Sequence, residues 1–505
     1  MARGGEMQVV ELDDAPDAVP DEADDQPRRV RWRRPVAVGG VVALVGAALA
    51  GGQWVVDARE RSAIAALEGI PGVIAPIEGD LRVLRTVTQA ELGDQFGGVG
   101  DVTSAPDGSQ AYEWDDPESG ATLWTAPLLG PTPRLAHDES DGRSLNVSTN
   151  CQPGAHADEQ DDTSPAGRVI CLVSNGGMLV DADYLGTEVP GTTTRLVILD
   201  TGDGSVVTDR RVGPAANLAV VPGLAVVATL VDGAPAVTAY DLASGDEAWR
   251  RDLPASAVSA DDAAMGMAGV FVSAAGERFV VQSPVNRVTL LSREGQVLRD
   301  LDADVGRSID DWWVDPATGR LLYSTSSSGT ASTVTLVTND RDLSKDVEIV
   351  GSHVYFTVDD GSLPGIVLTG GQQLQAWDSA SGSASWSTDD DRLSAADSAI
   401  VLRGDVFVIA GSILAAIDGR TGEVLWSTPL DAGGYARRML TDGRSVVVEL
   451  DNEQGGALAL VSYDRTSGEV MSRSPIPGGF DQVFPDREGR LIGYDPESEH
   501  YVVLG

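Results

Sequence analysis

After residue 80 the chain is a series of short apolar runs separated by turn residues. Residues 352–386 contain HVYFTVDD, GIVLTG, QLQAWD and SASWS, which are four such runs in succession. Alternation of apolar and polar residues with a period of two predicts half-buried β-strands. No long run with the 3.6-residue period of a helix follows residue 80. The pattern therefore predicts an all-β fold for most of the chain.

One predicted hairpin recurs along the sequence. In Ala416–Trp426 an apolar run ends at Asp418, Gly422 follows, and Trp426 begins the return strand. An aspartate can accept hydrogen bonds from backbone N–H groups two residues on, glycine tolerates a positive φ, and tryptophan offers a large surface for packing on a neighbouring repeat. Copies at Ile198–Thr208 and Leu290–Asp300 lack the tryptophan. The residues predicted to form turns and to pack the repeats are Asp115, Gly120, Trp124, Asp241, Gly245, Trp249, Asp378, Gly382, Trp386, Asp418, Gly422, Trp426, Asp464 and Gly468.

The spacing of the turn aspartates indicates how the repeats are organised. Asp200 and Asp241 are 41 residues apart, and Asp378 and Asp418 are 40 apart. A period near forty with four strands per period is typical of β-propeller blades. The chain ends with only about three strands, so we expect Leu81–Val87 to supply the fourth strand of the last blade. Residues 125–195 exceed the length of one blade, which predicts a long loop or an irregular blade there.

The motif Asp-x-x-(Thr/Ser)-Gly-x-x-x-Trp at such intervals resembles the PQQ-like repeat. That repeat occurs in quinoprotein alcohol dehydrogenases and in outer-membrane assembly scaffolds of the BamB type. The resemblance covers residues 81–505 and implies a β-propeller with eight blades of four antiparallel strands, the usual number in that family. With the anchor predicted below, the chain resembles the membrane-anchored, PQQ-binding-like propeller proteins of GC-rich bacteria.

The first eighty residues carry the signals for location. Residues 1–34 form an acidic, proline-broken tail that we expect to be disordered, and this tail ends in a cluster of five arginines. Pro35–Val56 has 22 residues and no charge, which predicts a single transmembrane helix. Arginines before the helix place the tail in the cytoplasm and the rest outside, with residues 57–80 as a linker. Cleavage after Ala48-Leu49-Ala50, as in a signal peptide, is the alternative, and it exports the same residues.

Composition limits the chemistry. The chain has 36 basic and 77 acidic residues, a formal charge of −41, which disfavours nucleic-acid binding. It has four scattered histidines and two cysteines, too few for a zinc cluster or a disulfide framework. In an exported chain, Cys151 and Cys171 are expected to form one disulfide, which would contribute on the order of 3 kcal/mol. The spacing of Asp300, Asp302 and Asp304 is only weakly like a calcium loop, and we predict no metal site.

The sequence lacks an assembled catalytic set. Quinoprotein dehydrogenases hold the quinone with a metal ion, a catalytic aspartate and, in many, two adjacent cysteines, whereas Cys151 and Cys171 are twenty positions apart. No C-x-x-C-H haem motif is present. We therefore expect no catalytic residue and no cofactor. The expected function is a membrane-anchored, non-catalytic binding or scaffolding module of the cell envelope with a protein partner. The alternative is a PQQ-dependent oxidoreductase.

Overall fold

The computed structural model describes residues 62, 64–67, 70–77, 79–87, 100–115, 121–136, 144–154, 167–180, 186–213, 215–231, 234–254, 270–283, 287–302, 307–315, 318–327, 332–430, 435–451, 457–477, 480, 482–486, 489–495 and 500–505. The chain divides into the units Met1–Ser62 and Ala63–Gly505, and the description concerns the second. The predicted tail (1–34) and membrane helix (Pro35–Val56) lie outside the described residues. Within the described part, no helix has the length and hydrophobicity needed to cross a membrane.

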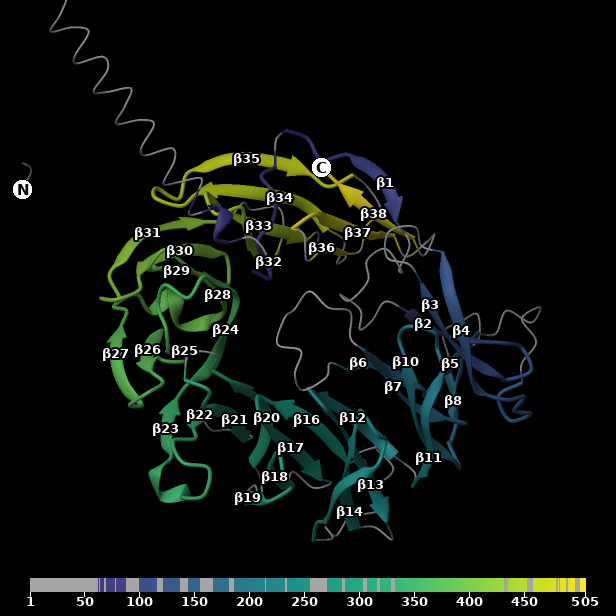
Figure 1. Cartoon of the computed structure of the whole chain (residues 1–505). Helices are drawn as coiled ribbons and strands as arrows, with labels where there is room; N and C mark the ends of the chain where they lie inside the picture. The colour runs from purple at the N-terminus through teal and green to yellow at the C-terminus, as the bar shows by residue number, and fades with distance from the viewer. Residues whose placement is uncertain are drawn as a thin grey trace, which may run out of the picture. The chain divides into compact units, whose positions relative to one another are not determined.

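The unit Ala63–Gly505 is built from β-strands, as the hydrophobic pattern predicts (Figure 1). The strands up to Asp252 are β1 (Val83–Val87), β2 (Gly100–Ser104), β3 (Gln110–Asp115), β4 (Thr122–Leu129), β5 (Ser144–Val147), β6 (Asn150–Gly154), β7 (Arg168–Ser174), β8 (Gly177–Val180), β9 (Gly186–Val189), β10 (Thr194–Asp200), β11 (Val206–Val212), β12 (Ala215–Val221), β13 (Leu224–Val231), β14 (Ala234–Asp241) and β15 (Glu247–Asp252).

The second half of the unit continues the same pattern. Its elements are β16 (Phe271–Ala275), β17 (Arg278–Ser283), β18 (Arg287–Ser292), β19 (Val297–Asp302), β20 (Arg307–Val314), β21 (Leu321–Ser327), β22 (Thr333–Leu336), β23 (Val347–Val350), β24 (Ser352–Asp359), β25 (Ile366–Gly370), β26 (Gln375–Asp378), β27 (Ser383–Ser387), β28 (Ala396–Leu402), β29 (Asp405–Ala410), β30 (Ile413–Asp418), β31 (Val424–Pro429), β32 (Tyr435–Thr441), β33 (Ser445–Asp451), β34 (Ala457–Asp464), β35 (Val470–Pro475), β36 (Gln482–Pro485), β37 (Leu491–Asp495) and β38 (His500–Leu504), with the short 3₁₀ helices η3 (Leu343–Lys345) and η4 (Asp391–Ala395).

These strands form antiparallel sheets that follow one another in chain order around a ring, as in a β-propeller (Figure 1). Among the described residues, four-stranded sets are β6-β7-β10-β11, β12–β15, β16–β19, β20–β23, β24–β27, β28–β31, β32–β35 and β36-β37-β38-β1. A three-stranded sheet, β2-β3-β4, stands beside them. The eight four-stranded sets fit the predicted blade, and the total number of blades remains a prediction.

The two ends of the propeller meet in one sheet. β1 pairs antiparallel with β38, with Thr86 opposite Val502 and Val87 opposite Tyr501. The strand expected at Leu81–Val87 therefore completes the last sheet, as the shortage of C-terminal strands predicted. Backbone pairing of the first and last strands covers the edge of β38 and ties the ends of the unit together.

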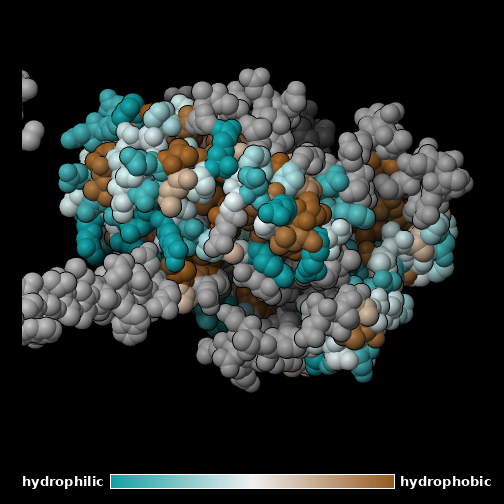
Figure 2. Space-filling view, turned by 90° about the horizontal axis from the view of Figure 1, so that it is seen from above, coloured by the Kyte–Doolittle hydropathy of each residue, from teal (hydrophilic) through white to brown (hydrophobic). Residues whose placement is uncertain are grey.

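The core lies between neighbouring sheets. The middle strands are buried along nearly their whole length, as in LAVVATLV of β13, because both faces of each sheet are covered by the adjacent sheets. The outer strands, such as β31, alternate exposed and half-buried residues. In one such core, Phe407 and Leu414 pack with Met439 and Val448 of the next sheet. Figure 2 shows hydrophobic residues on the visible face as separate patches among hydrophilic ones.

Two regions differ from regular blades. Between β4 and β10 the chain inserts a three-stranded sheet, β5-β8-β9, in the region where the length predicted an irregular blade. Part of the segment 57–80, predicted as a linker, packs on the propeller, because Leu67 and Ile74 are apolar and almost completely buried. Val73 also forms a β-bridge with Thr441.

Candidate functional site

The repeated aspartates bind the backbone of their own turns. Asp464 Oδ1 accepts hydrogen bonds from the N–H groups of Thr466 and Ser467, both at 2.9 Å. Asp418 Oδ1 accepts from Arg420 and Thr421 at 3.0 and 2.9 Å. Asp241 and Asp378 make the same kind of contact with the residues that follow them. The hydroxyls of Ser381 and Thr466 are the main donors that lower the pKa of Asp378 and Asp464, with the backbone N–H groups adding to them. The pKa of Asp418 is lowered mainly by the backbone N–H of Arg420.

Each described tryptophan of the repeat docks on the turn of the following sheet. The indole N–H of Trp426 donates to the carbonyl of Arg465 at 3.0 Å, and Trp386 donates to Gly419 at 2.8 Å. Trp124 and Trp249 donate in the same way to Thr201 and Arg293. The turn glycines have a φ near +70°, as at Gly245, Gly382, Gly422 and Gly468.

The turn glycine also leaves space for the indole. A Cβ on Gly468 would lie 2.5 Å from a ring carbon of Trp426, and one on Gly422 would lie 2.9 Å from Trp386. The motif therefore couples neighbouring sheets, because the glycine of one repeat receives the tryptophan of the preceding one. Asp115 ends β3, while Gly120 lies outside the described residues.

Other residues take the tryptophan position where the motif lacks it. The side chain of Thr208 occupies the space that a Cβ added to Gly245 would need. Arg299 forms an ion pair with Asp346 at 2.6 Å and donates to the carbonyl of Asn339 at 2.5 Å, so an arginine replaces the indole as the donor to the next sheet. The side chain of Arg299 is buried, and that of Asp346 is only 10% exposed. These contacts hold neighbouring sheets together.

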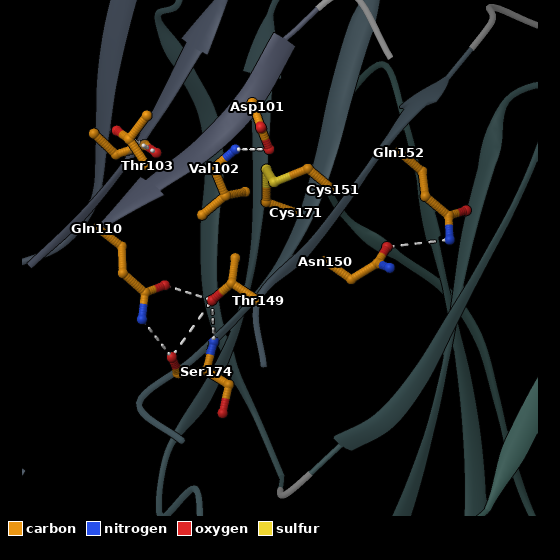
Figure 3. The surroundings of a disulfide bond; sticks show 11 residues. Asp101, Val102, Thr103, Gln110, Thr149, Asn150, Cys151, Gln152, Cys171 and Ser174 are labelled. Carbon is orange, nitrogen blue, oxygen red and sulfur yellow. Dashed lines mark hydrogen bonds between the residues drawn. A yellow bond between two sulfur atoms is a disulfide. The ribbon is translucent and has the colours of Figure 1, made fainter. Parts of the chain in front are cut away.

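The two cysteines form a disulfide between β6 and β7 (Figure 3). Cys151 and Cys171 are direct cross-strand partners, and Cys171 is completely buried. Close to them, Gln110 of β3 donates to the carbonyl of Ser174 at 3.1 Å, and Thr149 donates to Gln110 Oε1 at 2.5 Å (Figure 3). The disulfide joins two neighbouring strands of one sheet, and the hydrogen bonds of Gln110 tie the sheet β2-β3-β4 to that sheet.

A cleft opens where β24 leaves its own sheet. Ser352–Val354 pair antiparallel with β25. From Tyr355 to Asp359, β24 instead pairs in parallel with β28 of the following sheet, which joins the two four-stranded sets into one eight-stranded sheet. The N-terminal part of β25, at Ile366 and Val367, keeps its pairing with β26 but has no partner in β24. The divergence of the two strands leaves a wedge-shaped space between them.

This space is a cavity of 540 Å³ whose opposite wall comes from β20. Trp313 of β20 stacks on His353, with ring centroids 3.6 Å apart and planes inclined by 16°. Tyr355 meets His353 edge-on at 4.5 Å. Tyr355 is 46% exposed, so part of its ring faces solvent. The cavity is in the size range of small-molecule sites and has the aromatic walls typical of them.

Two carboxylates border the same cavity. Asp315 follows β20, is buried, and accepts hydrogen bonds from the hydroxyls of Thr318 and Ser379. Asp359 ends β24 and accepts from the N–H of Gly361 at 2.9 Å. Burial raises the pKa of Asp359, and the charges of Asp360 and Asp315 raise it further against the opposing effect of the Gly361 hydrogen bond.

The cleft was missed at the sequence level. HVYFTVDD is correctly predicted as a strand, but nothing in its alternation indicates that it changes partner halfway. A usable signal was the spacing of His353 and Tyr355, since residues i and i+2 of a strand share one face. None of the repeat residues predicted from the sequence lines this cavity. Among the described residues, no group of three or more His, Cys, Asp or Glu is placed to hold a metal ion.

Comparison with known proteins agrees with the repeat. Residues 307–498 match the family model described as outer membrane protein assembly factor BamB. No curated protein matches the chain. Many solved structures do, and three of them are a BamB from Moraxella catarrhalis, the computationally designed Ika8 protein, and the dihydro-heme d1 dehydrogenase NirN in complex with DHE.

The three structures are distant likenesses. The identities are 14%, 13% and 16%, and the TM-scores are 0.31, 0.34 and 0.33. The matches cover 62%, 66% and 79% of this chain and 93%, 94% and 78% of the other chains. TM-scores this low do not establish a common arrangement. The family match agrees with the predicted PQQ-like repeat over residues 307–498, and it does not test the predicted membrane anchor.

Proposed function

We propose that this protein is a membrane-anchored β-propeller on the outer side of the cell membrane, where it acts as a non-catalytic binding or scaffolding module. The observation that carries the proposal is a repeat architecture of the BamB kind in which the recurring residues serve turns and packing. Binding is then left to the parts that differ between repeats, of which the cleft beside β24 is the clearest.

The proposal includes the single-pass anchor Pro35–Val56, with its N-terminus in the cytoplasm, and a protein partner in the envelope. It also includes eight blades of four antiparallel strands, which the eight four-stranded sets support. Protease treatment of intact cells tests the location, because an exported propeller loses a C-terminal epitope tag without cell lysis. Protection of the tag until lysis would contradict the proposed orientation.

A PQQ-dependent oxidoreductase is the competing function, and one assay separates the two. The full chain in detergent is mixed with PQQ and Ca²⁺, freed of unbound cofactor, and tested for dye reduction with a panel of alcohols. We expect neither retained quinone absorbance nor dye reduction. Stoichiometric retention of PQQ together with substrate-dependent dye reduction would replace the binding module by an enzyme.

A further inference from the structure

The cleft beside β24 brings aromatic rings and a carboxylate together. Its walls carry the rings of Trp313, His353, Tyr355 and Phe356, and Asp359 lies at its border. Aromatic rings present negative electrostatic potential on their faces, so a ring and a carboxylate together favour a cation. A neutral apolar ligand would gain nothing from the carboxylate.

Asp359 has no ion-pair partner among the side chains that the structure describes. Arg320 donates to the carbonyls of Ser379 and Ala380 and is not among the described ion-pair partners of Asp359. Asp360 and Asp315 are both close enough to raise the pKa of Asp359, so no opposite charge among these neighbours offsets it. A half-buried carboxylate in this setting gains most from a cation brought in by a ligand.

We propose that this cleft binds an organic cation, an alkylammonium or guanidinium group, with Tyr355 and Trp313 against its apolar shell and Asp359 as its counter-ion. The inference deepens the proposed binding function and rests on it. A cavity of 540 Å³ accommodates such a group together with a few more atoms of its carrier. The same chemistry occurs in free small molecules and in the basic side chain of a peptide, and the test includes both sources.

Calorimetric titration of the full chain in detergent tests the proposal. The probes are choline, its neutral isostere 3,3-dimethylbutan-1-ol, agmatine, and the peptide Gly-Arg-Gly with blocked ends. We expect one saturable site for choline or agmatine and binding at least about tenfold weaker for the neutral alcohol. Tighter binding of the peptide than of agmatine would assign the site to a protein ligand, and the reverse would assign it to a free small molecule.

Substitutions decide whether the cleft is the site. Asp359→Asn and Tyr355→Leu should each weaken cation binding about tenfold, whereas Tyr355→Phe keeps the ring and should retain it. Asp80→Asn makes the same charge change at an exposed position that does not line the cleft and should have no effect. Circular dichroism of every variant verifies that the propeller is folded.

Three results would overturn the inference. The first is that no cationic probe shows saturable binding at concentrations up to about 10 mM. The others are equal affinity for choline and the neutral alcohol, or cation binding that is unchanged in both Asp359→Asn and Tyr355→Leu. Failure of the cleft and failure of the scaffold are distinguishable. If the cations do not bind while the chain still captures an envelope partner, only the cleft assignment falls.

Discussion

Glu449 offers a direct test of how the buried charges of this propeller are balanced. It lies in the middle of β33, is fully buried, and faces Arg438 across the pair β32–β33. Arg438 donates to the carbonyl of Val483 in the next sheet, at 3.2 Å. No described donor meets full hydrogen-bond geometry with either carboxylate oxygen of Glu449, although the backbone N–H of Val483 is near enough to lower its pKa slightly. Burial therefore raises the pKa of Glu449 from 4.5 to about 7, with Arg438 opposing the change and Asp451 adding to it.

The size of the effect follows from linkage. The folded state holds the proton of Glu449 more tightly than the unfolded state does. The contribution of this proton to the free energy of unfolding is therefore fully present below pH 4.5 and is lost as the pH rises through about 7. One pKa unit corresponds to about 1.4 kcal/mol, so the loss between these limits is about 3 kcal/mol. Glu449→Gln replaces the carboxyl group by a neutral amide of the same shape and removes this loss.

Urea unfolding of the full chain, followed by tryptophan fluorescence at pH 5, 6, 7 and 8, provides the measurement. Glu449→Gln should match the wild type at pH 5 and exceed its free energy of unfolding by about 2–3 kcal/mol at pH 8. Glu423→Gln, at an exposed position, is the control and should follow the wild-type profile. If the free energy of unfolding of Glu449→Gln differs from that of the wild type by the same amount at every pH from 5 to 8, the carboxylate is not buried as described.

Three further predictions concern contacts within and between sheets. Gly468→Ala adds a Cβ 2.5 Å from an indole carbon at a φ of +71°, whereas Gly319→Ala strains a φ of +65° with no atom within 4 Å. Urea unfolding should show the first variant at least about 1–2 kcal/mol less stable than the second, and equal losses would refute the docking role of the glycine. Replacing Cys151 and Cys171 together by Ala should lower the free energy of unfolding by about 3 kcal/mol, and a loss near zero would mean that strand pairing alone holds β6 and β7. Arg299→Met leaves a buried carboxylate without its cation and should cost about 3 kcal/mol or more, whereas an unchanged midpoint would show that the ion pair contributes nothing.

The sequence predicts the repeated parts of this fold well, because each is determined by local chemistry. Asp464 and Gly468 define a turn within five residues, and a period near forty then indicates blades. The pairing of β1 with the last sheet could also be predicted, because the last blade has too few strands of its own and needs another one. The disulfide followed from two cysteines in a chain expected to be exported.

Features that depend on contacts between distant parts of the chain could not be predicted from the sequence. β24 pairs first with β25 and then with β28, and the alternation of apolar and polar residues does not indicate which of these two strands it pairs with at a given position. The replacement of an indole by Arg299 could be seen only as a missing tryptophan, since its partner Asp346 lies 47 positions away. The raised pKa of Glu449 depends on burial by the following sheet, which no single strand encodes.

The most direct measurement of the central claim is cross-linking capture of the full chain from intact membranes. Lys345 is the only lysine, so a carboxyl-reactive or photoactivated cross-linker suits this acidic chain better than an amine-reactive one. An affinity-tagged bait is compared by quantitative mass spectrometry with an unrelated single-pass protein carrying the same tag. The binding-module account predicts reproducible enrichment of one or a few envelope proteins, with cross-links that map to the propeller. Recovery of only the abundant membrane proteins, at the same level as with the unrelated bait, would contradict it.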